Sequence, residues 1–307
     1  MRKDRFAYSK LSVEKICTHF GVSRQAYYKS LQRDFDRLAD RQTILNLIKE
    51  RRVFLPREGG RKLHRYLTPL LQQAGIQLGR DRLFDLLRAE QMLVRPKRRY
   101  TITTNSAHRF RVYPNITPEL DLTGPHQLYV SDITYIQTRT GFMYLCLTTD
   151  AWSRKIVGYD ISDSLEMVGC LRALKMAINQ LPANHQLIHH SDRGSQYCSA
   201  AYTALLKKNN IRISMADKGN CYQNALAERV NGILKDEFYL DHNFAAKPLA
   251  AKATNQAIAL YNQLRMHTNI DWLTPEQKHS SKPGYQQKQR LMSLPLTTPS
   301  FNYNNMV

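Results

Sequence analysis

The pattern of hydrophobic and polar positions divides the chain into a helical first third and a β-rich remainder. Over residues 36–95 apolar residues recur at helical spacing, and the glycines of REGGRKL at 57–63 interrupt them. The run at 80–94 places four apolar side chains on one side of a helix, namely Leu83, Leu86, Leu87 and Met92. This pattern predicts a small all-helical domain over residues 36–100, built like a helix-turn-helix bundle.

A shorter helical pattern precedes it in LSVEKICTHFGVSRQAYYK at residues 11–29. Gly21 supplies a turn, because a residue without a Cβ adopts positive φ at little cost, and Ser23 is placed to cap the helix that follows. The spacing is typical of a helix-turn-helix over residues 1–35. Its candidate DNA contacts are Arg24, Gln25, Tyr27 and Lys29. A plain helical hairpin fits the same pattern, so the motif alone leaves both interpretations open.

From residue 126 the pattern changes to short runs rich in β-branched and aromatic residues. Strands are predicted at 126–138, 142–150, 155–162, 186–191 and 211–215, and helices at 164–181, 199–210 and about 222–239. The order β-β-β-α-β-α-β-α predicts an α/β ribonuclease-H-like core with a mixed five-stranded sheet and flanking helices. We place this core at residues 126–280, after a linker at 101–125 and before a C-terminal tail at 281–307.

The charge of the chain indicates a polyanionic partner. The formal net charge is +20, and residues 1–110 hold 25 of the 45 Lys and Arg residues but only 10 of the 25 Asp and Glu residues. Phosphate contacts supply most non-specific affinity for nucleic acids, so a basic helical region favours double-stranded DNA as the partner. The basic run RPKRRY adds four candidate DNA contacts: Arg95, Lys97, Arg98 and Arg99. A solvated tail is the alternative for this run.

Several protein classes are excluded by what the sequence lacks. No apolar run approaches the roughly 20 residues that span a bilayer, and the N-terminus has no apolar core of a secretory signal. We therefore expect a cytoplasmic protein with no membrane partner. Its five cysteines are scattered without a CxxC pair, which predicts reduced, mostly buried thiols and argues against disulfides or a zinc site.

Three acidic residues are candidates for a shared site. Asp132 lies in the middle of the first predicted strand, where a carboxylate is costly unless something neutralises it, and Asp192 follows directly on the fourth. These two strands are neighbours in the predicted fold. Glu228 lies in a polar stripe of the last predicted helix, together with Asn224, Asn231 and Lys235. A turn residue at Asp192 and an ordinary amphipathic surface helix are the alternatives.

Three carboxylates without basic partners nearby favour a hard divalent cation. Oxygen ligands suit Mg²⁺ or Mn²⁺, and two such ions can promote in-line displacement at a phosphodiester. The two adjacent histidines, His189 and His190, point to opposite faces of one strand and have no cysteine partners, so they do not indicate zinc. Turn and cap roles account for Asp150, Asp160 and Asp163.

The residues around these acids carry a family resemblance. Asp132 in SDITYIQT, Asp192 in HHSDRGSQY and Glu228 in NALAERVNGILKDEF resemble the three acids of DDE transposases and integrases. The spacing of 35 residues between Asp192 and Glu228, and Lys235 seven residues beyond Glu228, are similar to the orf-B proteins of IS-three-type insertion sequences, relatives of retroviral integrase. The likeness extends through DAWSRKIVGYDIS and YNQLRMHTNIDWLTPEQ.

This resemblance implies an activity and roles for the site residues. It implies binding of the terminal inverted repeats of an insertion sequence, metal-dependent cleavage at DNA 3′ ends, and strand transfer. Asp132, Asp192 and Glu228 would be both catalytic residues and metal ligands, and no other cofactor is expected. Lys235 would contact DNA near the site; a favourable charge near a helix C-terminus is its alternative.

The resemblance also implies partners. Pairing two DNA ends calls for a homo-oligomer, and an upstream orf-A helix-turn-helix protein, or a frameshift fusion with it, is a candidate partner. Binding to DNA would associate the chain with the bacterial nucleoid. Two other functions fit part of the sequence: a DNA-binding regulator with a degenerate catalytic domain, and a nuclease of the same fold that performs no strand transfer.

Overall fold

The computed structural model describes residues 12–95, 110–118, 120–217 and 224–281. The chain forms two compact units, one made of residues 1–52 and 59–93 and the other of residues 53–58 and 94–307. We call them the helical unit and the core unit and describe each by itself.

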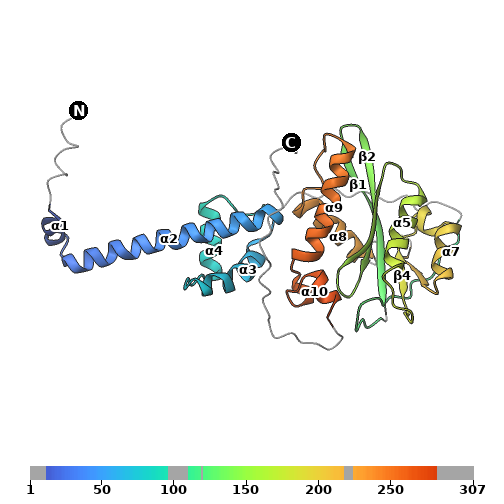
Figure 1. The fold of residues 1–307 in the computed structure, drawn as a ribbon, viewed down its shortest axis with the longest axis horizontal. Helices are drawn as coiled ribbons and strands as arrows, with labels where there is room; N and C mark the ends of the chain where they lie inside the picture. The colour runs from blue at the N-terminus through green and yellow to red at the C-terminus, as the bar shows by residue number, and fades with distance from the viewer. Residues whose placement is uncertain (1–11, 96–109, 119, 218–223, 282–307) are drawn as a thin grey trace. The chain divides into compact units, whose positions relative to one another are not determined.

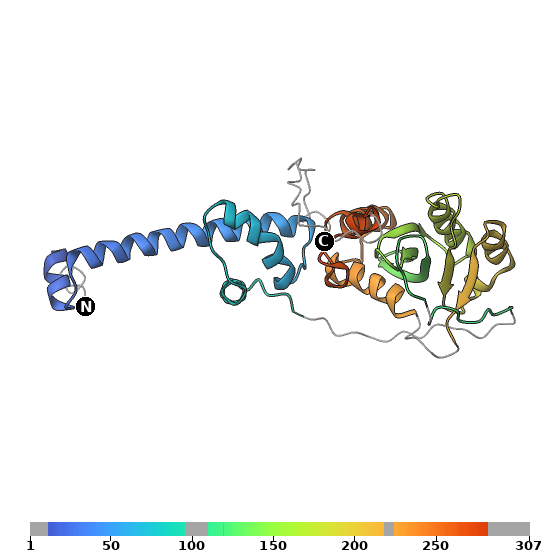
Figure 2. The same cartoon turned by 90° about the horizontal axis from the view of Figure 1, so that it is seen from below.

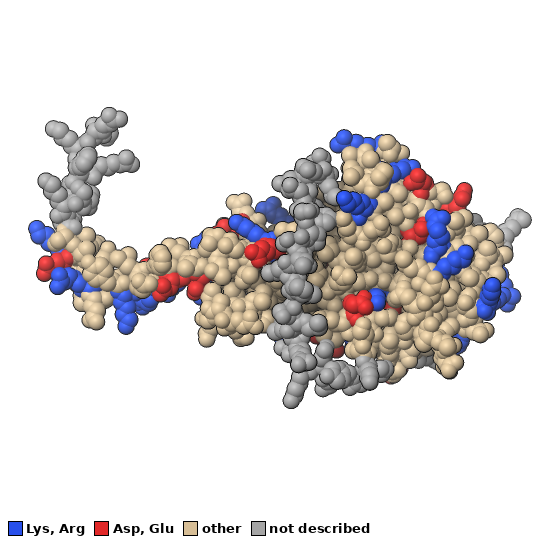
Figure 3. All heavy atoms as spheres, in the orientation of Figure 1, with Lys and Arg blue, Asp and Glu red and all other residues tan. Residues whose placement is uncertain are grey.

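The helical unit contains α1 (Val13–His19), α2 (Arg24–Phe54), α3 (Gly60–Gln73) and α4 (Arg80–Ala89). Its core is formed by buried side chains of α2, α3 and α4, namely Ile44, Ile48, Leu63, Leu67, Leu71, Leu83 and Leu87. Leu86 and Met92 also pack against this core. The single helix predicted over 80–94 is wrong in its length, because α4 ends at Ala89 and Met92 follows Gln91, whose φ is +55°. Acidic and basic side chains lie interspersed along α2 (Figure 3).

The α1–α2 turn forms as predicted. Gly21 has a φ of +65°, and the Ser23 hydroxyl accepts a hydrogen bond from the Ala26 N–H at 3.1 Å, which caps α2. From Arg24 onward α2 continues without interruption to Phe54, so the domain boundary expected between residues 35 and 36 falls inside one helix. No glycine or proline interrupts this stretch, which explains why the helix continues.

The core unit is built on one five-stranded sheet in the order β3-β2-β1-β4-β5. The strands are β1 (Leu128–Thr138), β2 (Gly141–Asp150), β3 (Ile156–Ser162), β4 (Ile188–Ser191) and β5 (Arg212–Met215). β1 pairs antiparallel with β2 and parallel with β4, and β2 pairs antiparallel with β3. The predicted mixed sheet of a ribonuclease-H-like fold is confirmed, including the adjacency of the first and fourth strands.

Helices cover both faces of this sheet (Figures 1 and 2). They are α5 (Met167–Ile178), α6 (Ser195–Cys198), α7 (Ala200–Lys208), α8 (Ala225–Glu237), α9 (Lys247–Leu264), the 3₁₀ helix η4 (Thr268–Ile270) and α10 (Pro275–His279). α8 and α9 pack on one face, around Ile136, Leu145 and Tyr261. α5 and α7 pack on the other, around Tyr129 and Leu174. The sheet is therefore the middle of three layers.

The described part of the predicted linker, residues 110–118 and 120–125, contains no helix or strand but lies against the core unit. Ile116, Leu120 and Leu122 pack on a buried cluster that includes Val130 and Ala227. The Ile116 N–H also donates to the Ser214 hydroxyl of β5 at 3.1 Å.

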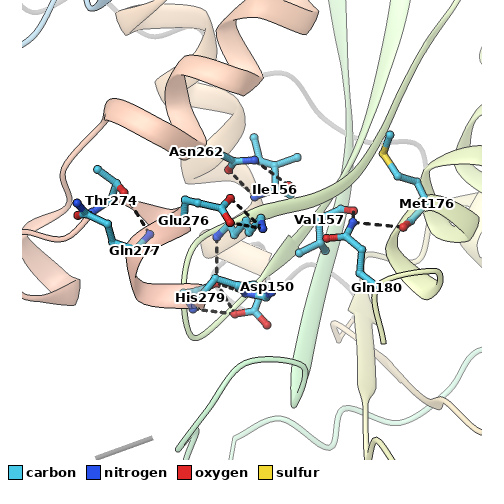
Figure 4. Close-up of polar contacts among 12 residues, drawn as sticks. Asp150, Ile156, Val157, Met176, Gln180, Asn262, Thr274, Glu276, Gln277 and His279 are labelled. Atoms are coloured by element: carbon cyan, nitrogen blue, oxygen red, sulfur yellow. Dashed lines mark hydrogen bonds and ion pairs between the residues drawn. The ribbon is translucent and has the colours of Figure 1, made fainter. Parts of the chain in front are cut away.

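The turn between β2 and β3 is held by a buried carboxylate. Asp150 Oδ1 accepts hydrogen bonds from the Ser153 N–H and hydroxyl, each at 2.7 Å, and Oδ2 accepts one from the His126 N–H at 2.7 Å. The Ser153 hydroxyl in turn lies 2.9 Å from His279 Nδ1 on α10 (Figure 4). Asp150 therefore has the turn role that the sequence predicts.

The C-terminal helices fasten the edge strand β3. Asn262 of α9 accepts from the Ile156 N–H at 2.9 Å and donates to its carbonyl at 3.0 Å (Figure 4). Tyr261 donates to the Arg154 carbonyl at 3.0 Å, and Lys155 pairs with Glu276 at 2.9 Å. The long motif from residue 261 to 277 thus has a structural role in this unit.

The sequence also predicts the state of the cysteines and the character of the helices with respect to membranes. Cys17, Cys146, Cys170 and Cys198 are free and buried, as predicted, and Cys221 lies outside the described residues. Within the described ranges, no helix combines the length and the apolar character needed to cross a bilayer.

Gly158 provides a test of the packing between β3 and α5. A Cβ at this position would lie 2.1 Å from the Ala173 carbonyl oxygen, so Gly158→Ala should push the helix off the strand and lower the free energy of unfolding by about 1–3 kcal/mol, measured by urea denaturation. Gly232→Ala in α8 is the control, because nothing lies within 4 Å of its Cβ position and alanine favours a helix. Equal stability of the two variants would contradict this packing argument.

Candidate active site

The register of two parallel strands brings Asp132 and Asp192 next to each other. Ser131 of β1 is paired with Ser191 of β4, and each aspartate is the next residue of its chain segment. Asp192 Oδ1 also accepts a hydrogen bond from the Gly194 N–H at 2.9 Å. Asp192 therefore acts as a turn residue and still contributes its charge to the edge of the sheet beside Asp132.

Two asparagines fix α8 against β1 on either side of Glu228. Asn224, at the start of the helix, donates to the Ser131 carbonyl at 3.2 Å, and Asn231 donates to Asp132 Oδ2 at 2.8 Å. Both asparagines are buried, whereas Glu228 is exposed. Since residues three and four apart share a helix face, these contacts turn the face that carries Glu228 toward Asp132.

The contact made by Asn231 was not predicted. Its position on the polar stripe was visible from the sequence, three residues after Glu228, but the stripe alone does not reveal which acid the amide meets. The spacing was the only available signal, because the partner, Asp132, lies 99 residues earlier in the chain.

The three carboxylates share one electrostatic environment. Burial and the neighbouring charge of Asp192 raise the pKa of Asp132 to about 7, and Glu228 adds a smaller repulsion in the same direction. The hydrogen bond from Asn231 opposes this effect, because it favours the charged carboxylate. Two like charges therefore act on the Asp132 carboxyl at this edge of the sheet.

The chemistry of the site fits a hard divalent cation. Its donors are carboxylate oxygens, and the buried side-chain oxygens of Asn224 and Asn231 accept no hydrogen bond from the described residues. Among the described residues, no group of three or more His, Cys, Asp or Glu side chains forms a ready-made metal cluster. The donor types and the mutual repulsion of the acids thus suit such an ion, while the acids are not drawn together into a closed shell.

Lys235 lies on the same helix face, two turns beyond Glu228. Its ammonium nitrogen is 4.3 Å from the centre of the Tyr135 ring on β1, a cation–π arrangement. Burial lowers the pKa of Lys235, while the nearby charges of Asp132 and Asp241 act in the opposite direction. Lys235 is thus held at the margin of the site, and its contact with DNA stays a prediction.

His189 and His190 are buried in the sheet, where their rings meet hydroxyl groups. His189 Nε2 lies 2.9 Å from both the Ser131 and Tyr202 hydroxyls, and His190 Nδ1 lies 2.8 Å from the Ser214 hydroxyl. Burial lowers the pKa of His189 to about 3, so this ring is uncharged near neutral pH. The two rings have different partners, as expected for neighbouring residues of one strand.

The other predicted residues lie in the helical unit, elsewhere in the core unit, or outside the described chain. Arg24, Gln25 and Lys29 are exposed at the start of α2, and Tyr27 is partly exposed. Arg95 is exposed, while Lys97, Arg98 and Arg99 lie outside the described residues. Asp160 pairs with Arg172 at 2.6 Å, and Asp163 pairs with Lys247 at 3.5 Å.

Comparison with known proteins identifies the family. Two models described as integrase core domains match residues 123–221 and 209–275. The chain is 34% identical over 265 residues to the insertion element IS600 uncharacterized 31 kDa protein of Shigella sonnei, covering 85% of this chain and 96% of the relative. It is 31% identical over 275 residues to transposase InsF for insertion sequence IS3A of Escherichia coli K12, covering 88% and 94%. The chain belongs to this family of insertion-sequence transposases.

The predicted family resemblance is thereby confirmed. The transposase is an enzyme of the DDE class of polynucleotidyl transferases. Among solved structures it is similar to the HTLV-2 integrase catalytic core domain in complex with magnesium, with 22% identity, a TM-score of 0.41, and coverage of 51% of this chain and 97% of that one.

The crowding of charge predicts that the transposase gains stability when Asp132 is neutralised. The pKa of about 7 in the folded state lies above the ordinary 3.8, so the wild type loses stability as pH rises from about 4 to about 7, and the loss is complete above 7. Asp132→Asn should therefore be more stable than wild type at pH 8 without metal, by at most about 4 kcal/mol, in urea unfolding with a chelator.

The difference between Asp132→Asn and wild type should shrink at pH 4 and on addition of Mg²⁺, which would stabilise only the wild-type site. Asp163→Asn serves as the matched control, because that side chain is 66% exposed, and its stability should follow wild type at each pH. A variant less stable than wild type at pH 8 would contradict the electrostatic argument.

Proposed function

We propose that the transposase binds the terminal inverted repeats of its insertion sequence, cleaves the DNA at their 3′ ends and joins these ends to target DNA. The observation that supports the proposal is the electrostatic interaction of Asp132 with both Asp192 and Glu228, which places the three acids in one site. Water would be the nucleophile for cleavage and a DNA 3′-hydroxyl the nucleophile for joining. No covalent intermediate with the protein is needed.

Each side chain of the site has a proposed task. Asp132 and Asp192 would hold Mg²⁺ or Mn²⁺ between them, and Glu228 would complete the shell of a second ion. Bound there, the ions would supply charge neutralisation for in-line displacement at phosphorus. Asn231 would orient the Asp132 carboxylate through its 2.8 Å hydrogen bond, and Lys235 would contact a DNA phosphate as a compact cation.

DNA binding would rest mainly on the helical region. The exposed Arg24, Gln25 and Lys29, with Tyr27, fit a recognition helix whose first turns meet base edges and phosphates. The basic residues of the 95–99 run would follow the phosphate backbone. Pairing of two DNA ends would need more than one protomer, and association with an orf-A protein or fusion remains a prediction, as does association with the nucleoid.

Asp192→Asn should abolish both nicking and joining of a labelled terminal-repeat duplex in Mg²⁺ or Mn²⁺, with a loss of at least about 1000-fold, because it removes a charged ligand from both proposed ions. The assay separates nicked from joined products on a denaturing gel. Asp163→Asn, which alters an exposed acid paired with Lys247, should retain wild-type rates. If Asp192→Asn nicks and joins like wild type, the assignment of the site is wrong; nicking without joining by wild type would instead indicate a nuclease.

Arg24→Ala and Lys29→Ala should each weaken binding to terminal-repeat DNA and reduce the dependence of log K on log salt by about 1, because each removes one phosphate-contacting charge. Fluorescence anisotropy over a range of salt concentrations measures both quantities. Arg80→Ala is the matched control, since this exposed arginine of α4 pairs with Asp81. An unchanged slope in both α2 variants would remove this helix from the DNA-binding surface.

A further inference from the structure

The first half of α2 carries large apolar side chains that nothing in the described chain covers. Tyr28, Leu31, Phe35 and Leu38 are 57%, 48%, 68% and 63% exposed. We call these four residues the α2 stripe. Between Arg24 and Thr43 every residue is exposed or partly exposed, and the buried positions of the helix begin only at Ile44.

The α2 stripe has the spacing of a coiled-coil seam. Its members are separated by three, four and three residues, the alternation that keeps apolar positions facing one partner helix. At 100° per residue the four lie within about 80° of one another, and the charged Arg33 and Asp40 lie on the opposite side. Tyr28 and Phe35 take the a position of the heptad, and Leu31 and Leu38 take the d position. Leucine at d favours a parallel pair of helices.

A single exposed helix gains little stability by itself in water, because most helical stability in proteins comes from packing an apolar face. We propose that the α2 stripe pairs with the same stripe of a second copy of this chain, in parallel and in register. Four large side chains from each protomer would remove on the order of 1,000 Å² from water, which reaches the lower range of specific interfaces.

The charges along the helix favour a second copy over DNA. From residue 28 to 41 the basic residues Lys29, Arg33, Arg37 and Arg41 are interspersed with the acidic residues Asp34, Asp36 and Asp40. This segment is therefore almost neutral within a chain of net charge +20. Two copies of the segment repel each other little, and the segment offers little electrostatic attraction to DNA.

The same charges select the parallel orientation. In a parallel pair Asp34 faces Ala39 of the other copy across the seam. In an antiparallel pair that still matched all four members of the α2 stripe, the two Asp34 side chains would face and repel each other. Parallel pairing would also put both helix-turn-helix motifs at the same end of the paired helices, as dimers that read two half-sites require.

A cross-linking experiment on the full-length chain tests the location. Phe35→Cys places a thiol on the seam, where two copies meet, and mild oxidation should convert most of the protein into a disulfide-linked dimer on a non-reducing gel. Arg33→Cys, on the opposite side of the helix, is the matched control and should remain a single chain. The parent chain under the same oxidation sets the background, since its four described cysteines are buried.

Sedimentation equilibrium over a range of concentrations tests the energetics. Leu31→Glu with Leu38→Glu should weaken dimerisation at least 100-fold, whereas Arg33→Glu, which changes the net charge by the same amount, should dimerise like wild type. The proposal is overturned if wild type stays a single chain at all concentrations, if the double variant dimerises as tightly as wild type, or if Phe35→Cys cross-links no faster than Arg33→Cys. This interface deepens the proposed pairing of DNA ends and rests on it, but the tests use no DNA, so their failure leaves the catalytic proposal standing.

Discussion

The hydrogen bond from Asn231 to Asp132 joins α8 to β1, the first strand of the sheet, and the candidate site depends on this contact. A carboxylate inside a sheet is unfavourable, and here a second carboxylate lies beside it. The amide of Asn231 is the uncharged group that makes the arrangement tolerable while leaving the negative charge in place. The sheet supplies two acids through strand register, and α8 supplies the third, held against the sheet by its apolar face and by two buried asparagines that contact β1.

The order of the strands, and of the main helices up to α8, followed from the sequence because hydrophobic runs and turns are local signals. The helices after α8 were not predicted. The meeting of Asp132 and Asp192 followed as well, since parallel neighbouring strands end at the same edge of a sheet. The partner of Asn231 did not, because it depends on how a helix docks onto a strand 99 residues away. The continuous α2 was also missed: the sequence was divided between residues 35 and 36 into two helical regions, although no helix-breaking residue stands there.

Residues that are conspicuous in the sequence proved to be structural in several places. The histidine pair binds serine hydroxyls of neighbouring strands, and Asp150 closes a turn. The YNQLR segment, which is part of the family resemblance, fastens β3 through Tyr261 and Asn262. Similarity within a family therefore reflects folding as well as chemistry, and only the contacts of each side chain separate the two.

The fastening of β3 has a consequence for protein synthesis. Its contacts join residues far apart in the chain: Asn262 meets Ile156 across 106 positions, Glu276 meets Lys155 across 121, and His279 meets Ser153 across 126. Contacts of such high sequence separation form late. On the ribosome the catalytic sheet can close its edge only after the segment ending at His279 has emerged. The helical unit, whose core contacts are local, is complete well before that point, so a nascent chain presents its helical unit before it has a finished catalytic core.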